Sequence, residues 1–138
     1  MRKIIECGAL ILAILSILLF VISSCGSVGA LSGVRARLVF KVGYPGGNYD
    51  IDVELTEEET ERLRSIFEGK DCENLFSIPS CGFDGDVSIR FGSSVFSPAM
   101  DSCSGVRWGL TRYFDVTAEE IDYIHALFEK YGGFFPCI

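Results

Sequence analysis

The chain has 138 residues, of which 49% are hydrophobic and 22% are charged, and its formal net charge is −7. This length suits one domain, and the eleven phenylalanines, five tyrosines and one tryptophan argue against a disordered chain without a core. Because phosphate binding needs clustered lysine and arginine side chains, the acidic balance also argues against a nucleic-acid partner.

The first 24 residues have the layout of an export signal. Met1-Arg2-Lys3 gives a basic start, and the stretch from Gly8 to Ile22 contains no charged residue. Small and polar residues follow, which is the order expected of a signal peptide. The apolar stretch of 15 residues is shorter than the roughly 20 that a membrane-spanning helix needs. We therefore expect residues 1–24 to be a signal peptide.

The junction Ile22-Ser23-Ser24-Cys25 resembles the lipobox of bacterial lipoproteins, in which an aliphatic residue and two small residues precede a cysteine. The resemblance implies that Cys25 is lipidated, begins the mature protein and anchors it in a membrane of the cell envelope. It departs from the commonest form in having Ile22 where leucine is usual and Ser24 before the cysteine. Two alternatives remain, which are ordinary cleavage after Val28-Gly29-Ala30 and an uncleaved anchor over residues 4–22. All three place the domain outside the cytoplasm.

The predicted mature chain begins with a short linker. Residues 25–33 combine the lipidated cysteine with a segment of mostly small residues that predicts a flexible tether. A single extracytoplasmic domain is then expected over residues 34–138. Its first elements are two alternating strands, Arg35 to Val42 and Tyr49 to Leu55, joined by the turn Tyr44-Pro45-Gly46-Gly47-Asn48.

A helix is predicted to follow the second strand. Thr56-Glu57-Glu58-Glu59 is a capping box, and its carboxylates suit the positive end of a helix. Leu63, Ile66 and Phe67 share one face, and Gly69 ends the pattern.

The middle of the domain alternates again. Residues 86–91 and 95–100 predict a hairpin around Gly92-Ser93-Ser94. Pro98 has no N–H group, so it indicates an edge strand or an early end to the pairing. Two further extended segments are expected at 106–110 and 113–116.

A second capping box, Thr117-Ala118-Glu119-Glu120, opens a second amphipathic helix that stops at Gly132-Gly133. The order of strands, helix, strands and helix predicts an α+β domain. We expect an antiparallel sheet of about four to five strands, with two amphipathic helices on one face. The apolar residues 134–138 should pack against it.

Four cysteines lie beyond the signal and its junction, and they are Cys72, Cys81, Cys103 and Cys137. None belongs to a Cys-x-x-Cys pair, so the usual zinc and thioredoxin spacings are absent from the sequence. In an oxidising compartment, four cysteines predict two disulfides, no metal site and no cofactor.

The predicted pairs are Cys81–Cys103 and Cys72–Cys137. If Phe91 and Ser94 flank the turn of the middle hairpin, Cys81 and Cys103 lie nearly opposite each other on its strands. The second pair follows because Cys72 and Cys137 each come shortly after a helix. The main alternative is Cys72–Cys81 together with Cys103–Cys137.

Few residues suggest chemistry. Asp50, Asp52 and Glu54 point the same way along one strand, which makes them a candidate face for a cation or for a basic partner. Asp84-Gly85-Asp86 is a weaker candidate for a cation. His125, the only histidine, has no catalytic motif beside it, so a structural or surface role is expected. No catalytic residue is predicted.

These patterns favour a lipid-anchored, non-catalytic domain of the bacterial cell envelope. It would bind a protein, inhibit an enzyme or recognise an envelope polymer, and its acidity favours a basic partner. One alternative is a small hydrolase that uses two carboxylates facing each other in a cleft. Another is a structural envelope component without a discrete ligand.

Overall fold

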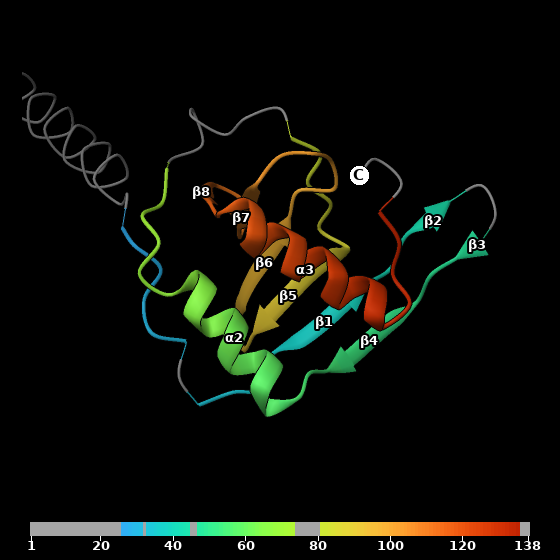
Figure 1. Ribbon diagram of the computed structural model, residues 1–138, viewed down its shortest axis with the longest axis horizontal. Coiled ribbons are helices and arrows are strands. Elements are labelled where there is room, and N and C mark those ends of the chain that lie inside the picture. The colour runs from blue at the N-terminus through green and yellow to red at the C-terminus, as the bar shows by residue number, and fades with distance from the viewer. Residues whose placement is uncertain (1–25, 32, 45–46, 74–80, 136–138) are drawn as a thin grey trace, which may run out of the picture.

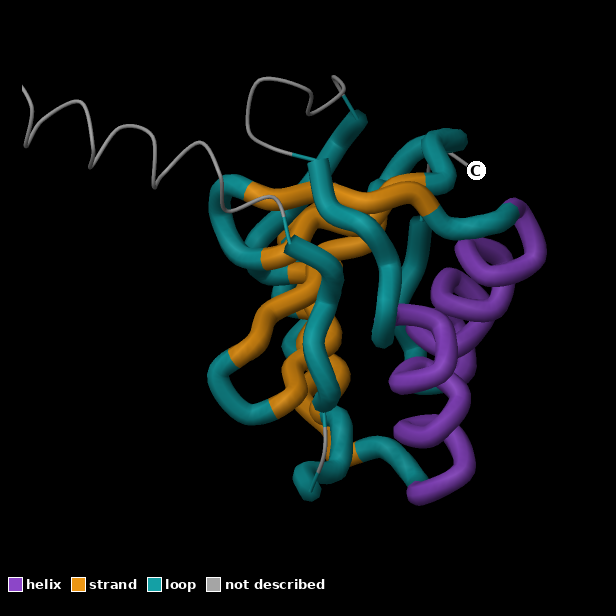
Figure 2. Tube along the Cα trace, turned by 90° about the vertical axis from the view of Figure 1, so that its left-hand side faces the viewer, coloured by secondary structure: helices purple, strands orange, loops and turns teal. Residues whose placement is uncertain are grey.

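The computed structural model describes residues 26–31, 33–44, 47–73 and 81–135. Both helices pack on one face of an antiparallel sheet, which confirms the predicted α+β fold (Figures 1 and 2). The elements in chain order are β1 (Arg37–Phe40), β2 (Gly43–Tyr44), β3 (Gly47–Asn48), β4 (Ile51–Glu54), α2 (Glu57–Phe67), β5 (Val87–Phe91), β6 (Ser94–Pro98), β7 (Gly105–Trp108), β8 (Arg112–Asp115) and α3 (Ala118–Lys130). The main sheet has six strands in the order β4-β1-β5-β6-β7-β8, whereas four to five were expected, and β2 and β3 form a separate pair.

The first hairpin forms as the alternation predicts. Leu38 and Phe40 of β1 are fully buried and lie opposite Val53 and Ile51 of β4. Because successive strand residues point to opposite faces, this register turns the charged residues of both strands away from the helices.

The second hairpin has the predicted register, with Phe91 opposite Ser94 across the turn. Gly92 at this turn has a φ of 57°, a conformation that glycine adopts without strain. Strand β6 ends at Pro98, which agrees with the early end to the pairing that this proline predicts. The strand itself is interior, because Pro98 also lies opposite Val106 of β7.

Both helices begin with the predicted capping boxes. The hydroxyl of Thr56 accepts from the backbone of Glu59, whose carboxylate accepts from Thr56 in return. Thr117 and Glu120 repeat this exchange at the start of α3. The two boxes fix where each helix starts and therefore how the helix layer lies on the sheet.

Aromatic rings fill the space between the sheet and the helices. Phe67 of α2 stacks on Phe96 of β6 at 4.7 Å between centroids and meets the ring edge of Phe114. Phe40 contacts Phe128 of α3 in the same layer. All five rings are almost fully buried, as expected when a small domain uses its aromatics for the core.

Residues 26–31 correct the prediction of a flexible tether. Val28 is 2% exposed, and its backbone exchanges hydrogen bonds with Lys70 and Gly69 after α2. Leu31 is also buried, and its carbonyl accepts from Arg64. The expectation considered only the small residues of this segment, but its two larger apolar side chains join the core. Residues 26–31 therefore pack against the domain that was expected to begin at residue 34.

Candidate functional site

A groove runs between the two helices on the outer face of the helix layer. It has a volume of about 1010 Å³ and is open to solvent. Leu127 forms its buried floor, and the half-buried Tyr123 and the exposed Ala126 lie beside it. The other lining residues are Thr56, Glu57, Glu58, Glu59, Glu61, Arg62 and Lys130. We call this feature the helix groove.

The two helices account for most of the net negative charge of the chain. Helices α2 and α3 together contain eight acidic and three basic side chains, which gives a net charge of −5. The six strands of the main sheet contain four arginines and three carboxylates. The groove lining itself holds four of the helix carboxylates together with Arg62 and Lys130, and its net charge of −2 favours a cationic ligand.

Glu59 joins the two walls of the groove. Its carboxylate accepts from Lys130 at 2.6 Å and from the Tyr131 hydroxyl at 2.8 Å, in addition to the capping contacts with Thr56. Burial acts to raise the pKa of Glu59, but the bonds from Lys130, Thr56 and Tyr131 outweigh it and lower the pKa to about 2. Glu59 is therefore a charged link between the start of α2 and the end of α3.

Tyr123 gives the groove an aromatic surface. The guanidinium of Arg62 lies 5.7 Å from the centre of its ring, within the range of a cation–π contact. Burial is the main cause that raises the pKa of the Tyr123 hydroxyl, which stays protonated at neutral pH. The ring is thus already in contact with one cationic side chain of its own chain.

The groove carboxylates all come from α2. Glu58 and Glu61 are exposed, and Glu61 also contacts Arg64. The wall formed by α3 supplies Tyr123, Ala126, Leu127 and Lys130. In the described part of the chain, the groove thus lacks two carboxylates that face each other, which was the arrangement expected of the hydrolase alternative.

The predicted face of Asp50, Asp52 and Glu54 is occupied by the chain's own cations. Arg37 binds Asp52, and Lys41 lies 3.2 Å from Asp50 and 3.8 Å from Asp52. Glu54 pairs with Arg35 at 3.3 Å. The basic residues on and beside β1 lie across from this row, so each carboxylate already has a partner.

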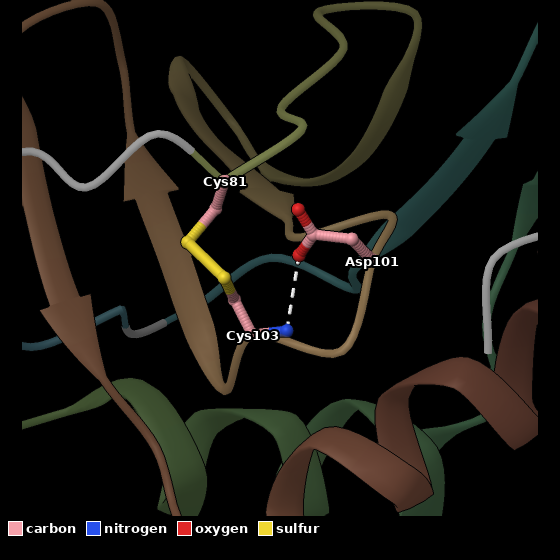
Figure 3. A group of neighbouring side chains, drawn as sticks. All are labelled: Cys81, Asp101 and Cys103. Atoms are coloured by element: carbon pink, nitrogen blue, oxygen red, sulfur yellow. Dashed lines mark hydrogen bonds between the residues drawn. A yellow bond between two sulfur atoms is a disulfide. The ribbon is translucent and has the colours of Figure 1, made fainter.

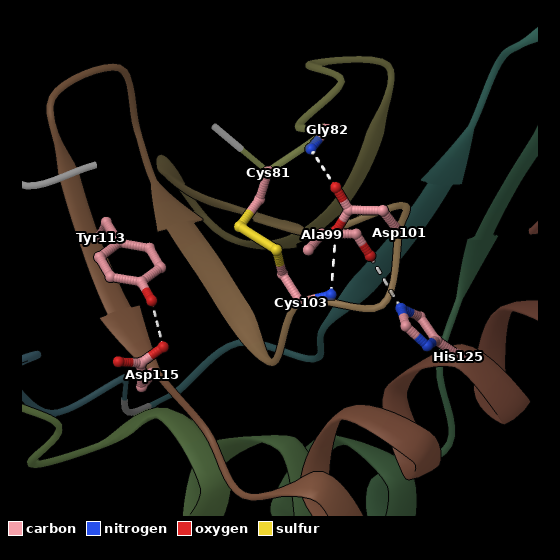
Figure 4. The surroundings of a disulfide bond; sticks show 8 residues. All are labelled: Cys81, Gly82, Ala99, Asp101, Cys103, Tyr113, Asp115 and His125. Carbon is pink, nitrogen blue, oxygen red and sulfur yellow. Dashed lines mark hydrogen bonds between the residues drawn. A yellow bond between two sulfur atoms is a disulfide. The ribbon is translucent and has the colours of Figure 1, made fainter. Parts of the chain in front are cut away.

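His125 is buried. Its Nε2 lies 2.8 Å from the carbonyl oxygen of Ala99 (Figure 4). Its ring centroid lies 4.4 Å from that of Phe135. Burial lowers the pKa of His125 in spite of the bond to Ala99 and nearby carboxylates. The surface position that the sequence left open is therefore wrong, and the structural role stays a prediction.

The disulfide Cys81–Cys103 is present as predicted, with 6.1 Å between the two Cα atoms (Figure 3). The carboxylate of Asp101 accepts from the backbone of Gly82 at 2.9 Å and from that of Cys103 at 3.0 Å. These two bonds hold the residues that flank the disulfide, and they lower the pKa of Asp101. Asp101 was not predicted from the sequence as a site residue. Aspartate favours turns in which its side chain accepts from the backbone N–H two residues later, and Asp101 accepts from Cys103 in this way.

Asp101, Cys81 and Cys103 also lie close enough together to suggest a metal site. The two sulfurs are bonded to each other, however, and a zinc ligand must be a thiolate. The cluster is therefore a stabilised disulfide.

The structure describes only one of the other predicted cysteine sites, Cys72. Cys72 is buried in the main core. Cys137 and Cys25 lie outside the described residues, so both the Cys72–Cys137 pair and the lipidation of Cys25 stay predictions. The alternative pairing of Cys72 with Cys81 is excluded by the observed bond.

Comparison with family models, curated proteins and solved structures found no match to this chain. Within the described ranges, the helices are too short and too polar to cross a membrane.

Proposed function

We propose that this protein is an exported, non-catalytic binding domain, anchored in a bacterial envelope membrane by lipid on Cys25. The helix groove binds a basic segment of a partner protein. The observation that carries the proposal is the combination of an apolar floor with exposed carboxylates in one groove of the acidic helix layer.

The partner's chemistry follows from the groove. Leu127 and Ala126 offer apolar contact, which favours a partner with aliphatic side chains at the centre of its contact surface. Glu58 and Glu61 lie on the rim, where charge governs orientation and the rate of association. A cationic amphipathic segment satisfies both conditions, and a structural component without a ligand would need neither.

A peptide titration tests this proposal. The probe is a helical peptide of lysine and leucine with its leucines on one face, and the control probe replaces lysine by glutamate. We expect the lysine peptide to perturb the amide resonances of Tyr123, Ala126 and Leu127, and the glutamate peptide to leave them unchanged.

Two charge reversals of equal size locate the contact. Glu58→Lys alters the groove rim, whereas Glu129→Lys makes the same change on α3 outside the groove lining. We expect Glu58→Lys to weaken binding of the lysine peptide roughly fivefold or more, and Glu129→Lys to have a smaller effect. Equal effects of the two variants would mean that the peptide responds to net charge only, and the groove would not be the site.

A further inference from the structure

Only a short stretch of chain separates the predicted lipid anchor from the domain. Ser27 forms an antiparallel β-bridge with Asp71, and Val28 is buried in the core. Cys25 is bonded to Gly26, and consecutive Cα atoms are about 3.8 Å apart. A lipid on Cys25 therefore brings one particular side of the domain to the membrane surface. This step rests on the lipid anchor of the proposed function.

The direction of the chain identifies that side. Ser27 pairs antiparallel with Asp71, and Glu73 pairs antiparallel with Tyr113 of β8. Going from Ser27 toward Cys25, the chain is therefore parallel to residues 71–73. Residues 71–73 in turn run parallel to the path from Tyr113 back toward Arg112 in β8. That direction ends at the turn between β7 and β8, which contains Leu110.

The figures agree with this arrangement. Figure 1 shows the first described residues beside the edge of the sheet that ends in β8. In the side view, the described chain begins to the left of the helices, and strand turns also point to the left (Figure 2). The first described residues thus lie beside the sheet, and the strand turns point away from the helix layer.

The β7–β8 turn has the chemistry of a membrane-interface contact. Leu110 is 83% exposed, the highest value among the described large hydrophobic residues. Trp108 is half-buried against Phe96, and the guanidinium of Arg112 lies 4.4 Å from the centre of the Trp108 ring. Arg112 has no ion pair within the described ranges of the chain, so its charge is open to an anion.

We propose that the β7–β8 turn rests on the lipid bilayer beside the anchor. Leu110 enters the boundary between headgroups and acyl chains, and Trp108 lies at the headgroup level, where tryptophan concentrates in membrane proteins. Arg112 binds an anionic headgroup while its aliphatic stem stays along the Trp108 ring.

This contact points the helix groove away from the membrane. The anchored side adjoins the end of α2 and the start of α3, where Lys70 pairs with Glu120. The groove lies toward the opposite ends of these antiparallel helices, near the pair of Glu59 and Lys130. The acidic helix layer is thereby kept clear of anionic lipids and open to a partner.

The single tryptophan makes the contact measurable. The lipidated full-length protein is reconstituted into vesicles of phosphatidylethanolamine and phosphatidylglycerol, with and without bromine on the upper acyl carbons of the lipids. We expect the brominated lipids to quench the emission of Trp108. Leu110→Asp should reduce the quenching, and Arg112→Ser should reduce it more in vesicles with phosphatidylglycerol than in vesicles of phosphatidylcholine alone.

Val34→Ser is the matched control, because Val34 is an exposed apolar residue next to α2, and it should leave the quenching unchanged. A protein that stays in the vesicle fraction without quenching of Trp108 would overturn the hairpin contact and leave the anchor intact. A protein whose vesicle association does not depend on Cys25, tested as Cys25→Ser, would overturn the anchor. Failure to associate with vesicles at all would overturn both.

Discussion

Replacing Glu59 by glutamine should destabilise the domain by disconnecting its two helices. The glutamine keeps the size of the side chain and can still accept from the backbone of Thr56, but it loses the charge that holds Lys130. The lowering of the pKa of Glu59 from 4.5 to about 2 corresponds to about 3 kcal/mol. Because the Lys130 side chain is 61% exposed, solvent screens part of this attraction, and we expect a loss of about 1–2 kcal/mol.

The pH dependence of this loss identifies its cause. A carboxyl whose pKa is lowered on folding stabilises the protein fully above its unfolded pKa and loses that effect as the pH falls toward its folded pKa. The difference between the wild type and Glu59→Gln should therefore be complete at pH 7, smaller at pH 3 and nearly absent at pH 2. Urea unfolding followed by far-ultraviolet circular dichroism measures it, and at pH 7 a loss of about 1–2 kcal/mol corresponds to a drop in Tm of roughly 4–16 °C.

Glu58→Gln is the control, because Glu58 is an exposed carboxylate of the same helix turn. It should change stability by no more than about 0.5 kcal/mol. Equal stability of Glu59→Gln and Glu58→Gln at pH 7 would refute the link between the helices. If the difference in unfolding free energy stayed constant down to pH 2, the lost stabilisation would come from packing and not from the charge of Glu59.

Three further predictions concern the rest of the domain. Cys103→Ser opens a link between residues 22 positions apart and should cost about 3 kcal/mol in urea unfolding, whereas a cost near zero would mean that the disulfide does not form in solution. Val28→Ala should cost about 2 kcal/mol because the segment belongs to the core, and a flexible tether would instead show no change. Since burial lowers the pKa of His125, acidification below about pH 6.5 should destabilise the wild type, and His125→Gln should weaken that slope in pH-dependent thermal melts.

The sequence predicts the local elements of this fold well because each carries its own physical signal. The alternation in residues 49–55 and the capping boxes at Thr56 and Thr117 are local patterns, and the structure has them where they were expected. The Cys81–Cys103 bond was also predictable, since it follows from the register of one hairpin.

Long-range features were not predictable in the same way. Glu59 and Lys130 are 71 positions apart, and nothing local in either segment indicates that they meet. The helix groove depends on that meeting, so its residues were missed, and the basic partner that the overall acidity favours stays a prediction. The burial of Val28 was missed because its neighbours are small, and one apolar residue gives no periodic signal.

The central claim is that the helix groove is the surface that binds a partner, and photo-crosslinking in the native envelope tests it most directly. A photoreactive amino acid at Ala126 places the probe in the groove, and one at Ser65 places it on an exposed position outside the lining. We predict a crosslink to a basic protein segment from Ala126 that is absent from Ser65 and is lost when Glu58→Lys is introduced. Equal crosslinking from both positions, or a crosslink from Ala126 that survives Glu58→Lys, would contradict the claim.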